Sequence, residues 1–181
     1  MKLARPPEVA LRLVRRNEGG SLLESVYRRY CRYVGAVILR LDGSQTDLDD
    51  LVQDVFVEAA RGIKRLRDPD AVKGWLATIA TRLVRRRLRL RRVRRFLGFG
   101  DGVERVPAVD PAASPLDRLV LLAVYRVLED LPVDDRLAFT LHHIEGEKLE
   151  TVARLCACST ATAKRRIARA REAVEARVGD G

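Results

Sequence analysis

The strongest constraint on the fold lies between Glu150 and Arg171, in the segment ETVARLCACSTATAKRRIARAR. A short amphipathic stretch is followed by a tight Cys-Ala-Cys-Ser step and then by a second periodic stretch. Ser159 is a natural N-cap for that second stretch, because its hydroxyl can accept hydrogen bonds from the free amides of a first helical turn. The pattern predicts a helix-turn-helix with helices at about residues 148–156 and 160–177.

The second helix of this motif is strongly basic on its outer side. Its expected buried stripe is formed by Ala163, Ile167, Ala170 and Val174, and no acid occurs in it before Glu172. Arginine can form paired hydrogen bonds with guanine in the major groove, while Lys, Arg and Thr reach phosphates. A solvated basic helix within a bundle is the alternative. The candidate DNA contacts are Thr160, Thr162, Lys164, Arg165, Arg166 and Arg169.

Charge is segregated along the 181 residues, which carry a formal net charge of +10. Residues 71–100 contain one Lys and nine Arg with no acid, whereas residues 47–60 contain five acids and no base. A polyanionic partner is expected from the net charge, and the segregation indicates two partner surfaces of opposite sign. A protein that is basic without such a partner is the alternative.

Almost every periodic segment has the spacing of a helix, and no alternating strand is evident. We therefore predict an all-α protein: two small helical domains joined by a flexible linker, the C-terminal one a helix-turn-helix. The segment between them is rich in Gly and Pro. The expected helices cover about 22–41, 48–63, 72 into the Arg-rich stretch, 116–131, and a helix from 132 to Gly146. The expected bounds of the parts are 1–95, 96–116 and 117–181.

The chain lacks an N-terminal apolar core of signal-peptide length and any stretch approaching 18 apolar residues. We therefore expect a cytoplasmic protein with no membrane insertion. Three cysteines, an odd number, do not make a disulfide framework.

An arginine stripe runs along one side of the helix predicted to begin near residue 72. Its members recur every three or four residues and can follow a phosphate backbone, and the neighbouring loop and Trp75 suit unstacked bases. The alternative for the stripe is an RNA or general polyanion tether, and for Trp75 a core position is preferred to direct stacking on a base. The stripe consists of Thr78, Arg82, Arg85, Arg89 and Arg92, broadened by Arg86 and Arg87.

The helix expected over residues 48–63 has a second face opposite its apolar stripe. Asp50, Gln53, Asp54 and Val57 recur at helical spacing there. An acidic face with an exposed Val suits docking of a basic protein partner. Acids near a helix N-terminus also favour the helix dipole, which is the alternative explanation.

Zinc binding or metal-dependent catalysis is a further alternative, since His142 and His143 could join Cys156 and Cys158. Cys-x-Cys is not the usual zinc spacing, and adjacent His side chains diverge on a helix. Structural packing is therefore preferred for all four, and neither a metal nor a cofactor is predicted. No paired nucleophile and base occurs in a supporting context.

Three segments together resemble the extracytoplasmic-function sigma factors of bacterial RNA polymerase. They are DLDDLVQDVFVEAARGI, GWLATIATRLVRRRLRLRR and LPVDDRLAFTLHHIEGEKLETVARLCACSTATAKRRIARAREAV. The resemblance covers about residues 17–95 and 117–177, which is most of the chain. It implies a sigma factor that is not an enzyme by itself and that binds core RNA polymerase and promoter DNA. It leaves open whether an anti-sigma factor is also a partner.

The resemblance implies a role for each charged surface. The acidic helix would dock on the largest catalytic polymerase subunit through Asp49, Asp50, Gln53, Asp54 and Phe56. The following loop and basic helix would recognise and open the −10 element through Arg67, Asp68, Asp70, Lys73, Trp75, Thr78, Arg82, Arg85 and Arg86. The helix starting at Thr160 would read the −35 element.

Departures from the family pattern bear on details. Leu66 and Val72 stand where many relatives have aromatic residues, which bears on base preference at −10. Ala157 replaces a common turn Gly, and Lys148 replaces a usual N-cap Ser, so we expect a less stable scaffold helix by about 1 kcal/mol. The main alternative function is an autonomous dimeric helix-turn-helix regulator, which leaves the acidic face and the arginine stripe unexplained.

Overall fold

The computed structural model describes residues 20–63, 68–98 and 114–178, and all regular structure in them is helical. The predicted all-α class is confirmed. The elements are α2 (Gly20–Asp42), α3 (Leu48–Gly62), the 3-10 turn η2 (Pro69–Ala71), α4 (Val72–Phe96), α5 (Pro115–Asp130), α6 (Val133–Phe139), the π-helical turn η3 (Thr140–Ile144), α7 (Leu149–Leu155) and α8 (Thr160–Val178).

The helices begin and end close to the bounds predicted from apolar periodicity and from helix-breaking Gly and Pro residues. Pro132 is the N-cap residue of α6 rather than its first helical residue. The main difference is that α6 passes into a π-helical turn at Thr140, where the sequence predicted one regular helix up to Gly146. Hydrophobic spacing does not distinguish a single π-turn from the α-helix around it, because the periods are too similar over five residues.

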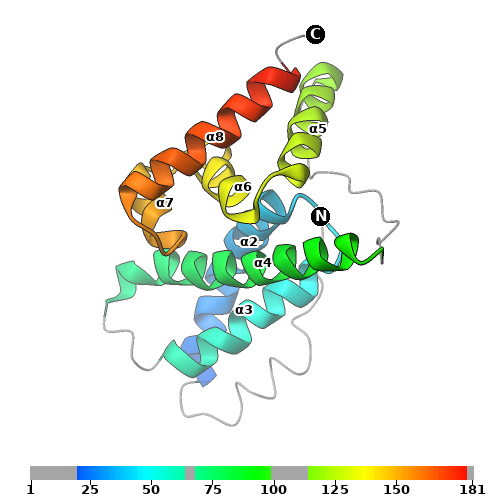
Figure 1. Ribbon diagram of the computed structural model, residues 1–181. Coiled ribbons are helices and arrows are strands. Elements are labelled where there is room, and N and C mark those ends of the chain that lie inside the picture. The colour runs from blue at the N-terminus through cyan, green and yellow to red at the C-terminus, as the bar shows by residue number, and fades with distance from the viewer. Residues whose placement is uncertain (1–19, 64–67, 99–113, 179–181) are drawn as a thin grey trace.

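Helix α4 lies across the middle of the molecule, with α3 on one side and α6 and α7 on the other (Figure 1). Its apolar side chains are buried along most of its length, and Leu76, Ala80 and Val84 are fully inaccessible. Helices α2 and α3 pack on it and on each other. These three helices form the N-terminal half of the described chain.

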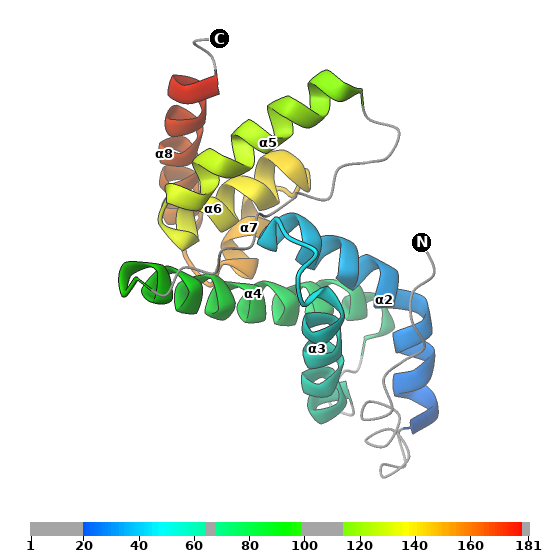
Figure 2. The same ribbon diagram turned by 90° about the vertical axis from the view of Figure 1, so that its right-hand side faces the viewer.

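Helices α5 to α8 form the C-terminal half. Tyr125, Leu128, Phe139 and Ala170 form a small separate core, in which α5 and α6 pack against α8. Figure 2 shows α6 between α5 and α4, with α8 beside α5 and α6. The scaffold and recognition helices expected from the sequence are α7 and α8.

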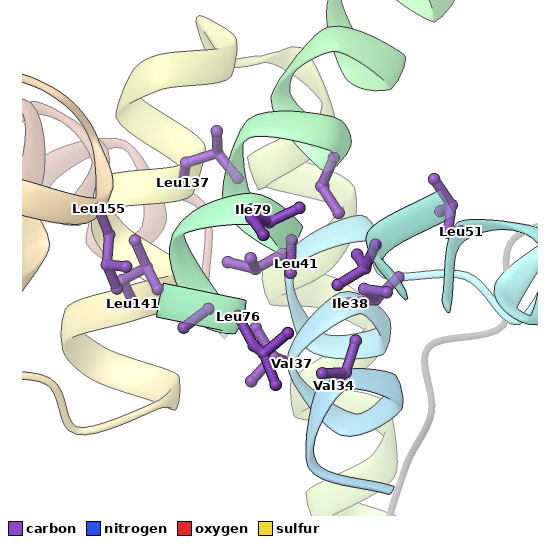
Figure 3. Packing of buried hydrophobic residues seen from close by; sticks show 14 of the residues in the cluster. Val34, Val37, Ile38, Leu41, Leu51, Leu76, Ile79, Leu137, Leu141 and Leu155 are labelled. Atoms are coloured by element: carbon purple, nitrogen blue, oxygen red, sulfur yellow. The ribbon is translucent and has the colours of Figure 1, made fainter. Parts of the chain in front are cut away.

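The two halves pack directly against each other. One hydrophobic cluster extends from α2, α3 and α4 into α6, η3, α7 and α8. Figure 3 shows Leu137 and Leu141 on one side of Leu76, with Val34 and Ile38 on the other. Complete burial of one leucine stabilises a fold by about 1.5–3 kcal/mol, so this shared core contributes substantially to the association.

The sequence predicted separate domains and did not anticipate this contact. The expected linker lies mostly within residues 99–113, outside the described residues. Within residues 20–63, 68–98 and 114–178, no helix is long and apolar enough to cross a membrane.

Candidate nucleic-acid and protein interfaces

The acidic surface of α3 is available for a partner. Asp49, Asp50 and Asp54 are exposed, and Gln53 is half-buried beside them. In the part of the chain that the structure describes, none of these three carboxylates forms an ion pair, whereas Glu58 pairs with Arg82. Three unpaired carboxylates on the exposed face of α3 therefore form a negative surface that is not neutralised by ion pairs among the described residues.

Phe56 does not belong to that surface. Its side chain is only 2% exposed, and its ring meets the ring of Tyr27 edge-on at a centroid distance of 4.7 Å. In this conformation Phe56 supports α3 from the core and is not part of the exposed acidic face. Phe56 is buried together with Leu51, Val52, Val55 and Ala59, and this helical spacing of apolar residues is the signal that identifies it as core.

The loop before α4 carries the first residues of the predicted −10 set. Arg67 lies outside the described residues, whereas Asp68, Asp70 and Lys73 are exposed. The Asp68 carboxylate accepts a hydrogen bond from the backbone N–H of Asp70 over 2.9 Å, which orders the start of η2. The Lys73 ammonium lies 4.8 Å from the centre of the Tyr33 ring, a cation–π contact with α2.

Trp75 is half-buried and packs against the hydrophobic core. A Cβ atom built on Gly62 would lie 2.8 Å from Cζ2 of the Trp75 ring, so the end of α3 and the indole are in close contact. The core position for Trp75 is therefore the one observed. One turn further along α4, Thr78 donates to the carbonyl of Gly74 over 2.9 Å and accepts from Arg154 of α7 over 3.3 Å.

Several arginines of the α4 stripe are paired with residues of the C-terminal half. Arg85 and Arg89 both pair with Asp134 at the start of α6, at 3.1 and 3.0 Å. Arg92 donates to the backbone carbonyl of Leu131 over 2.8 Å. Arg85 is therefore largely covered by the other half of the molecule, whereas Arg82, Arg86, Arg89 and Arg92 remain exposed.

The other side of α4 borders a basic groove of about 580 Å³ that runs between α4, α3 and the α2–α3 loop. Arg86 and Arg94 line it together with the exposed Leu90. Arg91 also lines the groove and donates to the fully buried Asp42 over 2.6 Å. The buried Asp42–Arg91 pair was not predicted, because residues 71–100 contain nine arginines and the sequence does not indicate which of them would pair with Asp42.

The recognition helix α8 begins as predicted. The Ser159 hydroxyl accepts from the backbone N–H of Thr162 over 3.2 Å, which confirms the N-cap. Ala157, in the turn before α8, adopts a left-handed conformation with φ of 47°. Lys148 makes no side-chain cap for α7, as expected.

The side chains of α8 fall into two groups. Thr160, Lys164 and Arg165 are exposed, and Thr162 is half-buried beside the cap. By contrast, Arg166 pairs with Asp134 at 3.2 Å, and Arg169 forms two hydrogen bonds of 2.8 and 2.9 Å with Asp135. The Asp135 carboxylate raises the pKa of Arg169.

Asp134 and Asp135 are the functional candidates that the sequence analysis missed. They occupy the first turn of α6, where acids are commonly explained by the helix dipole. Their partners lie in α4 and α8, far away along the chain, so no local spacing reveals the pairing. The surplus of arginines over acids in those helices was the only available signal.

The residues of the zinc alternative are not brought together. The Nδ1 atom of His142 lies 2.9 Å from the backbone carbonyl oxygen of Glu147, and the His143 ring lies 4.7 Å from that of Phe139. Burial raises the pKa of the Cys156 thiol to about 11, which opposes the thiolate that metal binding requires. Among the described residues, no three His, Cys, Asp or Glu side chains form a group that could hold a metal.

The fold and its surfaces define a class of protein: an all-helical protein with a helix-turn-helix, a basic second helix and a separate acidic face on α3. Sequence profiles make the class specific. The profile described as "Sigma-70 region 2" matches residues 26–94, and the one described as "Sigma-70, region 4" matches residues 121–174.

Individual relatives agree with these profiles. The ECF RNA polymerase sigma-E factor of Escherichia coli (strain K12) is 30% identical over 159 residues, which cover 83% of each chain. The ECF RNA polymerase sigma factor SigE of Mycolicibacterium smegmatis is 30% identical over 155 residues. The chain spans 58% of the length of that protein and 36% of the length of the probable RNA polymerase sigma factor RfaY of Xanthomonas campestris. The chain belongs to the extracytoplasmic-function group of the sigma-70 family.

Solved structures share this fold. The sigma factor RpoE in complex with the anti-sigma factor NepR from Bartonella quintana is similar with a TM-score of 0.59 and 25% identity. That similarity covers 84% of this chain and 93% of the other. CnrH in complex with the cytosolic domain of CnrY is similar in fold, with a TM-score of 0.58 and 23% identity.

Proposed function

We propose that this chain is a cytoplasmic sigma factor that binds core RNA polymerase and directs promoter-specific initiation of transcription. The observation that carries the proposal is the presence of two surfaces of opposite sign within the matched sigma-70 regions. The exposed acids of α3 lie in region 2, and the capped basic helix α8 lies in region 4. An autonomous DNA-binding regulator needs only the second of these surfaces.

Core binding is assigned to the acidic face of α3. Asp49, Asp50 and Asp54 present negative charge to a basic partner, and Gln53 adds a hydrogen-bonding group at the centre of the face. Complementary charge increases the rate of encounter and suppresses wrong partners. Because Phe56 is buried, its contribution is to hold α3 in position.

Recognition of the −35 element is assigned to α8, through Thr160, Thr162, Lys164, Arg165, Arg166 and Arg169. The exposed Lys164 and Arg165 are the groups most accessible to a major groove in this conformation. Recognition of the −10 element is assigned to the loop before α4 and to the arginine stripe. The chain acts there by binding, since capture of extruded bases and neutralisation of phosphates offset the cost of unpairing the duplex.

An anti-sigma factor is a further proposed partner. The relative RpoE was solved in complex with the anti-sigma factor NepR. The exposed apolar side chains of α5, among them Leu116 and Leu119, are free to take part in such a contact.

The test is complex formation with purified core polymerase, followed by gel filtration or native mass spectrometry. The wild-type chain is expected to form a one-to-one complex, and Asp50→Lys or Asp54→Lys to weaken it strongly without loss of helicity. Asp130→Lys is the matched control, because it makes the same charge reversal on an exposed residue of α5. Equal core affinity for all three variants would remove α3 as the docking face.

A different result would favour the autonomous regulator. Absence of a complex with core, together with tight binding of the free chain as a dimer to a palindromic duplex, would replace the sigma assignment.

A further inference from the structure

The last turns of α4 carry an apolar stripe that faces away from the core. Leu90, Val93 and Leu97 are spaced by three and four residues, which places them on one side of the helix, and Phe96 lies beside them. These residues are between 55% and 90% exposed and are four of the eight exposed large hydrophobic residues of the described chain. The buried Leu88 lies on the opposite side of the same turns. The stripe therefore makes no contribution to the hydrophobic core.

Arginines without ion-pair partners accompany this stripe. Arg86 lies one turn before Leu90 on the same side of the helix, and Arg94 lies one turn after it. Both are exposed, and within the described residues neither forms an ion pair or a side-chain hydrogen bond. No acid occurs between residues 71 and 100. The outer face of α4, defined here as Leu90, Val93, Phe96, Leu97, Arg86 and Arg94, therefore combines apolar area with positive charge that is not neutralised.

The outer face is regular and accessible. Figures 1 and 2 show the C-terminal end of α4, in green, extending past the neighbouring helices. The backbone N–H of Leu97 donates to the carbonyl of Val93 over 3.0 Å, so the helical arrangement reaches the last member of the stripe. A Cβ atom built on Gly98 would meet no atom within 4 Å. A flat partner can therefore approach this end of the helix without meeting another described element.

The partner that fits this face must be anionic and apolar at once. Nucleic-acid phosphates would pair with Arg86 and Arg94 but would leave the aliphatic side chains in water, since these have no ring to stack on bases. At the surface of a bilayer, anionic headgroups meet the cations of a helix while its apolar side chains enter the boundary with the acyl chains. A basic amphipathic helix is typical of binding to such a surface.

We propose that the outer face of α4 binds the surface of a membrane that contains anionic lipids, with the helix lying on the bilayer. Arg86 and Arg94 contact headgroup phosphates, and the apolar stripe enters the boundary between headgroups and acyl chains. This binding does not require a membrane-crossing segment, and the described residues contain no helix that could be one. The inference goes beyond the sigma assignment and does not depend on it. Because Arg86 also belongs to the predicted −10 set, lipid and nucleic acid compete for that side chain.

The charged and the apolar parts of the face both contribute to the affinity. One arginine near an anionic surface strengthens binding by about fivefold. Partial burial of one exposed phenylalanine strengthens it by about tenfold. The charged part is screened by salt, so the affinity is expected to fall with ionic strength while part of it persists.

The test is co-sedimentation of the full chain with vesicles. Vesicles of phosphatidylglycerol and phosphatidylcholine in equal parts are compared with vesicles of phosphatidylcholine alone. The wild-type chain is expected to bind the anionic vesicles and to leave the neutral ones largely free. Phe96→Ser is expected to weaken the binding by about tenfold, and Leu90→Ser by a smaller factor. Leu22→Ser is the matched control, because Leu22 of α2 is 51% exposed and Leu90 is 55% exposed.

A second pair of variants tests the charged part. Arg94→Gln is expected to weaken binding to the anionic vesicles by about fivefold. Arg32→Gln removes the same charge from an exposed arginine of α2 that has no ion pair within the described residues, and it is expected to bind like the wild type. Circular dichroism establishes that each variant is helical.

Several results would overturn the proposal. Absence of binding to anionic vesicles would do so, as would equal binding by the variants and their controls. Loss of binding in Arg94→Gln with none in Phe96→Ser and Leu90→Ser would show adhesion by charge alone. A wild-type dimer that Phe96→Ser converts to a monomer, without binding to vesicles, would assign the face to a second copy of the chain.

Core affinity, measured on the same variants, separates this inference from the proposed function. A Phe96→Ser variant that keeps its affinity for core and loses that for vesicles supports the lipid assignment. A Phe96→Ser variant that loses core affinity, with a wild type that ignores vesicles, assigns the face to polymerase and overturns the lipid assignment. A wild-type chain that binds anionic vesicles but not core refutes the sigma assignment and leaves this inference intact.

Discussion

The hydroxyl of Tyr125 donates a hydrogen bond to the backbone carbonyl of Arg40, over 2.8 Å, and so joins α5 to the last turn of α2. Tyr125 is buried, and burial raises the pKa of its phenol to about 12, against a partial lowering by Arg136 and Arg40. The neutral phenol is therefore the form that the folded state prefers.

This pKa predicts a loss of stability in alkali. An unfolded tyrosine ionises near pH 10, so its contribution to the free energy of unfolding is complete below that pH and is lost as pH rises towards 12. Urea unfolding between about pH 10 and about pH 11 is expected to show an extra decline of about 1 kcal/mol in the wild type relative to Tyr125→Phe. Parallel declines in the two proteins would contradict the assignment.

Loss of the buried ion pair of Asp42 is predicted to lower the free energy of unfolding strongly. Its side chain is 0% exposed and accepts from Arg91 over 2.6 Å. Asp42→Asn is expected to lower the free energy of unfolding by roughly 3 kcal/mol, because the guanidinium loses its counter-charge in a buried setting. Glu24→Gln is the control, since its pair with Arg28 is exposed and is worth less than about 0.5 kcal/mol. Similar losses for both variants in urea unfolding would show that the Asp42 pair is effectively solvated.

Substitution of Gly62 is predicted to lower stability and to change the fluorescence of Trp75, the single tryptophan of the chain. A methyl group on Gly62 would press on the ring of Trp75, so Gly62→Ala is expected to cost about 1–3 kcal/mol and to shift the Trp75 emission. In Gly35→Ala the new methyl lies 3.8 Å from Val52, an ordinary contact, and helix propensity favours the variant by about 0.5–1 kcal/mol. Thermal unfolding and fluorescence of the two variants check the prediction, which fails if both move in the same direction.

Substitution of Arg165 and of Arg169 is predicted to affect the melting temperature differently, although both residues are assigned to the −35 element. Arg165 is exposed and contacts only Thr162, at 3.4 Å, among the described residues, so Arg165→Ala is expected to leave the melting temperature unchanged. Arg169→Ala leaves the buried carboxylate of Asp135 without its bidentate partner and is expected to lower the melting temperature.

The functional part of this prediction concerns promoter discrimination. Once wild-type start sites are mapped, Arg165→Ala is expected to lose about 1–3 kcal/mol of preference for the intact −35 element over a scrambled one. Undiminished discrimination in transcription assays would remove Arg165 from the contact set.

The helices and the helix-turn-helix were predictable because their signals are local. The apolar stripe of α3 and the cap at Ser159 each report on residues within one or two turns. The same is true of the unpaired acids of α3, since exposure follows from their position opposite the stripe. Buried residues inside a predicted site, such as Phe56, were identifiable from the stripe alone.

The association of the halves was not predictable in this way. Periodicity indicates that Leu137 and Leu141 are buried, but it does not indicate against what. Asp134 and Arg136 are two residues apart in the chain, yet their partners lie in α4, α8 and α2. In the sequence, Gly43 has the features of an ordinary glycine at the end of a helix. The structure shows in addition that the Tyr125 ring packs closely against it.

Composition and local spacing were therefore sufficient for the helices, the two charged surfaces and the family resemblance, because each depends on residues close together along the chain. The tertiary structure alone determines that the arginines of α4 and α8 meet at Asp134 and that Tyr125 and Arg136 complete the end of α2. These contacts depend on how two amphipathic units share one core, and pairing between distant surfaces leaves no periodic trace in the sequence.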